Sequence, residues 1–278
     1  MSAKETISIL SIKPKILLYL LSFARLCVAI NIFIRNLSIL SCLSPVMRYT
    51  YDMTSKYALY EIDKISKRFA PDSGVPRGVR PHYNINPAQS VVVIVNRNGV
   101  NQIESMKWGF VPAEAKDTNS IFRYKTYNAK SEAIFDKPTW SRAIREQRCL
   151  IPANGFFEWK NLETGKTPYY IQTADQSLFS FAGVYGTWTD PDGITWGMCS
   201  IITTASDTDN EMIPSRLPVI VRPEDEADWL SPTISDMNSI YKIIKPYSPE
   251  QLKIYRVSDD ISSSKIDKPY LIERLAKQ

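Results

Sequence analysis

The stretch from Val91 to Met106 reads VVVIVNRNGVNQIESM. It predicts two strands, Val91–Val95 and Gln102–Met106, around the turn Asn98-Gly99, because an Asn-Gly pair between such runs is the strongest short-range signal for a β-hairpin. Further short strands are expected near residues 148–151, 155–160, 168–173, 178–185, 197–204, 217–221 and 252–256. Helical spacing of apolar residues is found over 55–69 and near 139–146, 223–229 and 236–244. Many short strands with irregularly inserted helices predict an α+β fold with a mixed, barrel-like β-sheet core.

The first 46 residues differ from the rest of the chain. They carry five basic residues against one acidic residue, and two apolar stretches, Ile16–Ala24 and Leu26–Ile34, are separated by Arg25. Each stretch is shorter than the ~20 residues of a membrane span. Three interpretations compete: a targeting or anchor segment, an amphipathic helix on a membrane surface, or a segment outside the fold that precedes a true start at Met47. The third is preferred, which places the domain at residues 47–278 and leaves membrane attachment through residues 1–46 as an alternative.

Composition restricts the classes of function. The net charge is +5, mostly from residues 1–46, so a nucleic-acid partner requires a local basic groove. The cysteines Cys27, Cys42, Cys149 and Cys199 form no Cys-x-x-Cys pair, and His82 is the single histidine. These facts argue against a metal site, a redox motif or a Ser-His-Asp triad, so no metal and no organic cofactor are expected. Few, scattered cysteines favour a reducing, cytoplasmic compartment.

Chemistry-bearing residues concentrate in a few segments. These are YNINP (83–87), MKWGFVP (106–112), YNAKSE (127–132), CLIPANGFFEWK (149–160) and, more weakly, IPSRLP (213–218). Singly, most have a structural interpretation: Asn84 as a turn residue, Trp108 as a packed aromatic, Asn128 as a helix cap. Glu158 lies between Phe157 and Trp159 on an expected strand. Pointing inward, it would be partly desolvated and a candidate general acid or base; pointing outward, it would be a solvated strand residue.

In order and spacing, the runs Trp108–Pro112, Asn128–Lys130 and Asn154–Trp159 resemble the SOS-response-associated peptidase family, and the resemblance extends from about Met47 to Leu271. It implies processing of abasic sites in single-stranded DNA. In this family a cysteine after the initiator Met becomes the N-terminus, and its α-amine and thiol trap the ring-opened sugar as a thiazolidine crosslink. A Glu transfers protons, an Asn positions the amine and the sugar, and a His assists ring opening.

Carried over by this resemblance, Asn128 and Glu158 are the expected catalytic residues. They are expected to face a common hollow with a floor of Trp108 and a positively charged rim. The expected DNA contacts, with the basic groups on phosphates, are Arg48, Asn84, Trp108, Lys130 and Arg216.

Two positions depart from the family pattern. The family begins Met-Cys-Gly-Arg, whereas this chain reads Met47-Arg48-Tyr49-Thr50, so the cysteine nucleophile is expected to be missing. The family histidine falls at Pro214, which has no titratable group.

Three functions therefore stay open: a crosslinking enzyme of DNA repair and the SOS response with peptidase- or lyase-type chemistry, a degenerate protein that binds single-stranded DNA without a covalent step, and a peptidase acting on other proteins. The resemblance favours an enzyme. A monomer near the nucleoid, without an obligate protein partner, is expected.

Overall fold

The computed structural model describes residues 54–70, 73–111, 115, 117–163, 165–206 and 212–276. The chain divides into two units, residues 1–48 and 49–278, and the first of these lies outside the described residues. The expectations for residues 1–46, including Cys27 and Cys42, therefore fall outside the description. Within the described ranges, no helix has both the length and the apolar character required to cross a membrane.

One sheet has five strands in the order β13-β8-β7-β1-β2. Its strands are β1 (Lys56–Leu59), β2 (His82–Ile85), β7 (Gly155–Leu162), β8 (Gly165–Thr173) and β13 (Leu252–Arg256). All of its neighbouring strands are antiparallel, and β1 lies between β2 and β7. In this sheet β1 and β7 are neighbours. Their pairing places Thr54, which directly precedes β1, next to Glu158 of β7.

The second sheet has the order β11-β10-β4-β3-β6-β9-β12, and β5 pairs with β10. Because β9 also pairs with β10, the strands β10, β4, β3, β6 and β9 close on themselves. The strands are β3 (Ser90–Arg97), β4 (Val100–Trp108), β5 (Asn128–Lys130), β6 (Arg148–Ala153), β9 (Phe179–Thr189), β10 (Thr195–Ala205), β11 (Arg216–Pro218) and β12 (Ile220–Val221). Since β10 pairs in parallel with β4 and β5 but antiparallel with β9 and β11, the sheet is mixed. The predicted α+β fold with a barrel-like core is confirmed.

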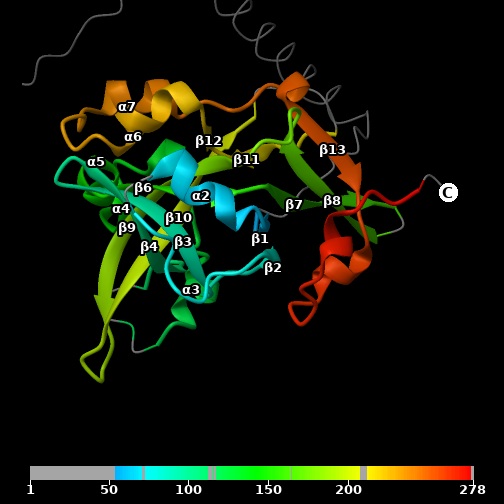
Figure 1. The fold of residues 1–278 in the computed structure, drawn as a ribbon, viewed down its shortest axis with the longest axis horizontal. Helices are drawn as coiled ribbons and strands as arrows, with labels where there is room; N and C mark the ends of the chain where they lie inside the picture. The colour runs from blue at the N-terminus through cyan, green and yellow to red at the C-terminus, as the bar shows by residue number, and fades with distance from the viewer. Residues whose placement is uncertain are drawn as a thin grey trace, which may run out of the picture. The chain divides into compact units, whose positions relative to one another are not determined.

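The helices are short and lie between strands. The α-helices are α2 (Ile62–Phe69), α3 (Ser120–Tyr124), α4 (Pro138–Ser141), α5 (Ala143–Glu146), α6 (Glu226–Leu230) and α7 (Met237–Ile243). The 3₁₀ turns are η1 (Ser131–Ala133), η2 (Pro223–Asp225), η3 (Pro249–Gln251), η4 (Asp259–Ser262) and η5 (Pro269–Ile272). Figure 1 shows α6 and α7 at one edge of the molecule, and the β9–β10 hairpin extending away from the body.

The hairpin at Asn98-Gly99 is formed as predicted. The strands β3 and β4 pair from Ser90↔Lys107 to Arg97↔Val100, so the two turn residues alone connect them. Asn98 has φ 54° and Gly99 has φ 87°, and two successive positive φ angles match the twist of the flanking strands. Local turn chemistry therefore sets the register of the central hairpin.

The predicted helix over residues 55–69 is only half correct. Residues 56–59 form the strand β1, and helix α2 begins at Ile62. All four residues of β1 are buried because the strand is covered on both edges by its neighbours, and this tertiary pairing overrides the local helical spacing. The partner of β1 on its other edge, β2, follows a segment rich in Pro and Gly and pairs with β1 in antiparallel fashion.

Successive residues of β1 and β7 face two different hydrophobic clusters. Tyr57 and Phe156 belong to the main core, whereas Ala58 and Phe157 belong to a smaller cluster beneath the C-terminal turns. Because side chains alternate along a strand, Glu158 faces the same side as Phe156, toward the main core. The inward orientation is thus the one that the fold adopts.

Candidate active site

Glu158 is completely buried, at 0% exposure. Its Oε1 accepts a hydrogen bond from the hydroxyl of Thr54. The pairing of β1 with β7 explains the contact, since Lys56 lies opposite Phe157 and the chain just before β1 must therefore run past Glu158. A buried carboxyl group beside a hydroxyl is equipped to give or accept a proton at a fixed point.

Asn128 approaches the same residue from the other sheet. It begins β5, opposite Ile201 of β10, and it is 6% exposed. Its Nδ2 donates to the carbonyl oxygen of Thr54 at 2.6 Å. Its Oδ1 is buried and accepts no hydrogen bond from the part of the chain that the structure describes. An unsatisfied buried acceptor is costly, so it marks a position where a donor is needed.

Thr54 therefore joins the two predicted catalytic residues. Its backbone carbonyl binds Asn128 and its side chain binds Glu158, and the threonine itself is only 1% exposed. Because β5 belongs to the second sheet and β7 to the first, the site lies where the two sheets meet. Asn128 and Glu158 are therefore linked through this third residue, which none of the sequence motifs contains, whereas the common hollow expected between them stays a prediction.

Trp108 lies in the hydrophobic core and does not form the exposed floor of a cavity. Its ring is 0% exposed, and its Nε1 donates to the carbonyl oxygen of Tyr127 at 2.8 Å. The ring packs edge-on against Tyr57 and Tyr127, with centroids 5.2 and 6.0 Å away. A ring with no exposed surface cannot stack on a base, so the expected DNA contact at Trp108 is corrected to a structural role. It braces the segments that carry Thr54 and Asn128.

Asn84 is likewise a structural residue in this fold. It is 3% exposed, and its Nδ2 donates to the carbonyl oxygens of Ser263 and Ile266, at 2.9 and 2.7 Å. Its Oδ1 accepts from Nζ of Lys56 at 2.9 Å. With its amide donor and acceptor both used within the protein, Asn84 is not available to a DNA strand, and the expected contact is corrected.

Lys56 is the notable cation near the site. It is 8% exposed, and its Nζ donates to the side-chain oxygens of Asn84 and Asn86. Burial lowers the pKa of Lys56 from 10.5 to about 8, because the low-dielectric surroundings disfavour its charged form. A cation two residues after Thr54 is thus held in a fixed place by two asparagines of the YNINP segment.

Lys130 and Arg216 lie on neighbouring parts of the second sheet. Lys130 ends β5 and is exposed, opposite Thr203 of β10. Arg216 begins β11, and its Nη1 donates to the carbonyl oxygen of Thr203 at 2.7 Å while its Nη2 lies 2.6 Å from Oε2 of Glu132. Burial by itself would raise the pKa of Glu132, but the hydrogen bond and charge of Arg216 leave it below its ordinary value. Both cations can face a phosphate strand from this edge.

The remaining residues discussed from the sequence are not seen at this site. Arg48 lies outside the described residues. Cys149 and Cys199 are fully buried, and burial raises the pKa of both thiols, so neither is a ready nucleophile. Pro214 is buried, and its carbonyl oxygen accepts from the hydroxyl of Ser206 at 2.6 Å. Among the described residues, no three side chains of His, Cys, Asp or Glu gather as a bound metal ion would need.

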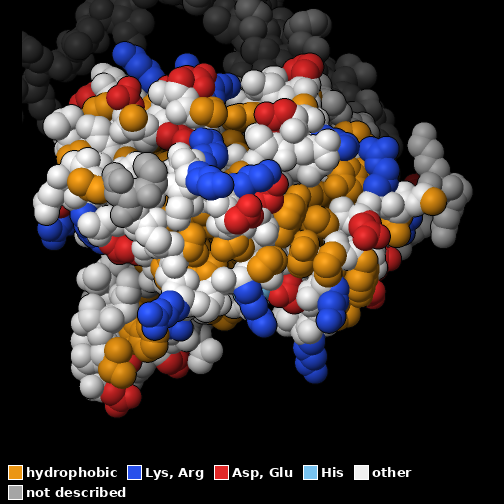
Figure 2. All heavy atoms as spheres, viewed as in Figure 1, with side chains coloured by type: hydrophobic (Ala, Val, Ile, Leu, Met, Phe, Trp, Pro, Cys, Tyr) orange, Lys and Arg blue, Asp and Glu red, His pale blue; other side chains and the backbone are white. Residues whose placement is uncertain are grey.

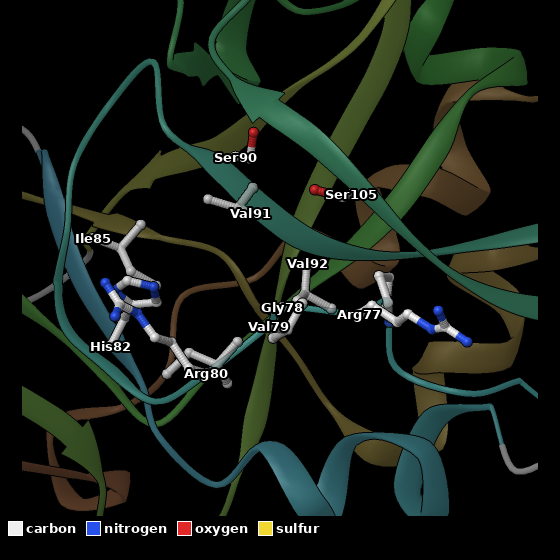
Figure 3. Close-up of a pocket in the computed structure, with 12 residues that line it drawn as sticks. Arg77, Gly78, Val79, Arg80, His82, Ile85, Ser90, Val91, Val92 and Ser105 are labelled. Carbon is white, nitrogen blue, oxygen red and sulfur yellow. The ribbon is translucent and has the colours of Figure 1, made fainter.

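A separate pocket of about 520 Å³ opens beside β1 and β3. Its lining includes Arg77, Arg80 and His82 but neither Asn128 nor Glu158. Arg80 and His82 lie together on one side and Arg77 on the other (Figure 3), and Nδ1 of His82 is 2.7 Å from Oδ2 of Asp267. Arg77 and Arg80 are exposed at this pocket, and Asp267 places a carboxylate beside His82.

The positively charged rim expected around the site is not evident as one continuous patch on the face shown in Figure 2. Figure 2 shows exposed hydrophobic side chains near its middle, with Lys and Arg interspersed among Asp and Glu around them. The charges on this face do not form a single basic groove. The candidate phosphate contacts are therefore individual, positioned cations such as Lys130 and Arg216.

Comparison with known proteins identifies close relatives. Residues 53–264 match the family described as SOS response associated peptidase (SRAP). The abasic site processing protein YoqW of Bacillus subtilis is 36% identical over 224 residues, which cover 80% of this chain and 99% of that protein. The abasic site processing protein YMR114C of Saccharomyces cerevisiae is 31% identical over 201 residues, or 70% of this chain and 53% of that protein.

Solved structures share the fold. A crystal structure of a protein from Bacteroides thetaiotaomicron has a TM-score of 0.68 at 26% identity and covers 81% of this chain and 99% of its own. A protein from Bordetella bronchiseptica has a TM-score of 0.61 at 21% identity, covering 74% and 99%. The second likeness concerns the fold alone. The overall fold is therefore one that other proteins also adopt.

Proposed function

This chain belongs to the SOS response associated peptidase family, and from that premise we propose that it processes abasic sites in single-stranded DNA. The observation that carries the proposal is the convergence of Asn128 and Glu158 on Thr54 from two different sheets. Relatives at 31–36% identity are named abasic site processing proteins. The shared family supports a shared substrate, and the convergence supports a working site at these residues.

The roles of the two residues follow from their surroundings. Glu158 is buried and hydrogen-bonded to a hydroxyl, so it is suited to transfer a proton at one fixed point. Asn128 holds a carbonyl through its Nδ2 and keeps an acceptor at Oδ1 for an incoming donor. In the proposed function Glu158 moves protons at the sugar, and Asn128 orients the reacting groups.

The DNA strand is proposed to contact Lys130 and Arg216 through its phosphates. Lys130 is exposed, and the Arg216 guanidinium is held in place by Thr203 and Glu132, so its direction is set before DNA arrives. Contacts of this kind position the backbone without reading sequence, and they weaken as salt rises. A monomer working beside the bacterial-type nucleoid in the cytoplasm is the proposed setting, together with a role in DNA damage repair and the SOS response.

A degenerate DNA-binding protein is the second candidate function. The observation that favours it is Pro214, which by the resemblance takes the place of the family's histidine and which is buried with its carbonyl group engaged. Proline supplies no proton, so ring opening of the sugar would lack that assistance. In this alternative Lys130 and Arg216 hold single-stranded DNA and no covalent step follows.

Binding measurements test the proposed function. The full-length chain is titrated into a labelled single-stranded oligonucleotide with one abasic site, and the matched controls are the same strand without the lesion and its duplex. We expect the abasic single strand to bind more tightly than the duplex, with an affinity that falls as salt rises. Equal binding to all three strands, or none, would refute abasic-site processing. Cleavage of an unrelated protein by the purified chain would instead support a peptidase.

A further inference from the structure

We propose that the pocket beside β1 and β3 binds a small aliphatic carboxylate, a molecule with a hydrocarbon chain and one anionic end. The volume of the pocket, about 520 Å³, is within the ~300–1,000 Å³ that is usual for sites enclosing small molecules. The lining contains neither Asn128 nor Glu158, so this site is separate from the one on which the proposed function depends. The proposal goes beyond that function.

The apolar part of the lining suits a hydrocarbon chain. It is formed by aliphatic residues, namely Leu59, Pro76, Val79, Ile85, Val91 and Val92. No Phe, Tyr or Trp is found in the lining that the described residues form, so a nucleobase has no aromatic ring there on which to stack. A flexible chain fits against branched side chains, and each CH₂ group that leaves water adds to its affinity.

Two arginines supply positive charge for the anionic end. Arg77 and Arg80 are exposed, and neither makes an ion pair or a hydrogen bond with another described residue. A guanidinium group can bind both oxygens of a carboxylate at once. An arginine that has no such partner within the protein is therefore ready to bind one from a ligand.

The carboxylate of Asp267 lowers this positive charge but does not remove it. Its Oδ1 accepts from the backbone N–H of Tyr83 at 2.6 Å, and its Oδ2 lies 2.7 Å from Nδ1 of His82. Both oxygens are thus engaged by β2. Two arginines against one carboxylate leave an excess of positive charge at the pocket, which attracts an anion.

Arg80 is the expected partner of the anionic end. It is followed by Pro81 and the start of β2, and a residue before proline is restricted in its backbone, whereas Arg77 lies in the loop beside Gly78. A restricted group loses less freedom when it binds. Figure 3 places Arg80 at one end of the pocket and Arg77 at the other, with valines between them. A chain that starts at Arg80 would lie against those valines.

Calorimetric titration of the full-length chain with straight-chain carboxylates tests the proposal. We expect saturable binding of octanoate, and an affinity that rises about two- to fourfold for each CH₂ group added from butanoate through hexanoate to octanoate. Hexanol keeps the chain without the charge, and it should bind at least about tenfold more weakly than hexanoate. Acetate keeps the charge without the chain, and it should also bind at least about tenfold more weakly than hexanoate.

Variants at exposed positions locate the anionic end. Arg80→Ala should weaken octanoate binding at least about tenfold, and Arg77→Ala less than about threefold. Arg123→Ala, at an exposed position of α3 outside the pocket, is the matched control and should leave the affinity unchanged. Thermal unfolding of each variant shows that it is folded.

Methyl NMR locates the chain independently of any variant. Octanoate should shift the methyl signals of Val79 and Val92, which line the pocket, and leave those of Val100 in the exposed hairpin turn unchanged. Shifts at Val100 alone would place the ligand elsewhere and overturn the proposal.

Other results would overturn it as well. These are no binding at millimolar octanoate, equal affinity along the length series, hexanol as tight as hexanoate, or full affinity in Arg80→Ala. A larger loss in Arg77→Ala than in Arg80→Ala would overturn the assignment of the anionic end. Abasic-strand binding is measured separately, so octanoate binding can fail while the proposed function stands, and the reverse also holds.

Discussion

The side-chain nitrogen Nδ2 of Asn128 lies 2.6 Å from the carbonyl oxygen of Thr54, 74 residues earlier in the chain. The contact joins the second sheet to the beginning of the first, and the Thr54 hydroxyl extends it to Glu158. Both hydrogen bonds are buried, so their geometry is held by the packed sheets and not by solvent. The predictions below follow from this junction and from the cations and amides around it.

Glu158→Gln should separate proton transfer from binding. The amide keeps the size of the carboxyl group and can still accept from Thr54, but it cannot exchange a proton. Under the proposed function, the rate of processing of an abasic site in single-stranded DNA should fall by about 100- to 10,000-fold. The affinity for intact single-stranded DNA should stay unchanged. Glu250→Gln, at an exposed position, is the control, and an unaltered rate in Glu158→Gln would exclude the carboxyl from the reaction.

Asn128→Ala should weaken the fold as well as the reaction. The change removes the donor to the Thr54 carbonyl and leaves that buried oxygen without its partner, which costs about 1–3 kcal/mol of unfolding free energy. Urea unfolding monitored by tryptophan fluorescence measures the loss. Asn238→Ala, at an exposed position of α7, should change the stability by less than about 0.5 kcal/mol.

Lys130→Ala should lower DNA affinity equally for every sequence. If its ammonium neutralises one phosphate, the slope of log affinity against log salt should become shallower by about 1. Titrations of single-stranded DNA at several salt concentrations give the slope. Lys67→Ala, an exposed lysine of α2, is the matched control, and the same slope for both variants would remove Lys130 from the DNA path.

Asn84→Ala should damage stability but not DNA binding. It removes one of the two partners of Lys56 and the donor to the carbonyl oxygens of Ser263 and Ile266, all within the protein. A loss of about 2–4 kcal/mol is expected, from several hydrogen bonds broken at a buried position. The affinity of the remaining folded protein for single-stranded DNA is measured in parallel. A selective loss of affinity without a loss of stability would return Asn84 to the DNA interface.

Lys56 should make stability depend on pH in the alkaline range. Because burial lowers its pKa to about 8 in the folded protein, against 10.5 for an ordinary lysine, the unfolded chain binds more protons at this residue between those values. The contribution of Lys56 to unfolding free energy therefore rises with pH in this window and is least favourable below it. Urea unfolding of the parent and of Lys56→Met at about pH 7.5 and about pH 10 gives the difference. A difference that stays constant with pH would mean that the lysine titrates normally.

The candidate site was predicted in part from the sequence. Asn128 and Glu158 were identified from motif order, and the structure joins both to one residue. Trp108 and Asn84 were expected at the DNA, and both are buried with their polar groups bonded within the protein. A motif records which residues recur together, but it does not state whether they recur because they touch a ligand or because they hold the fold. Burial distinguishes the two cases, and burial depends on the packed chain.

The amino-acid sequence by itself determined the Asn98-Gly99 hairpin, most of the later strands and the family. Turn chemistry acts between adjacent residues, and motif order can be read along the chain without knowing its path. Only the tertiary structure decided that residues 56–59 form a strand and that Thr54 meets Asn128 and Glu158. Those contacts span 74 and 104 positions, and they exist because β1 pairs with β7 while β5 joins the other sheet. No local pattern contains information about a pairing made at that separation.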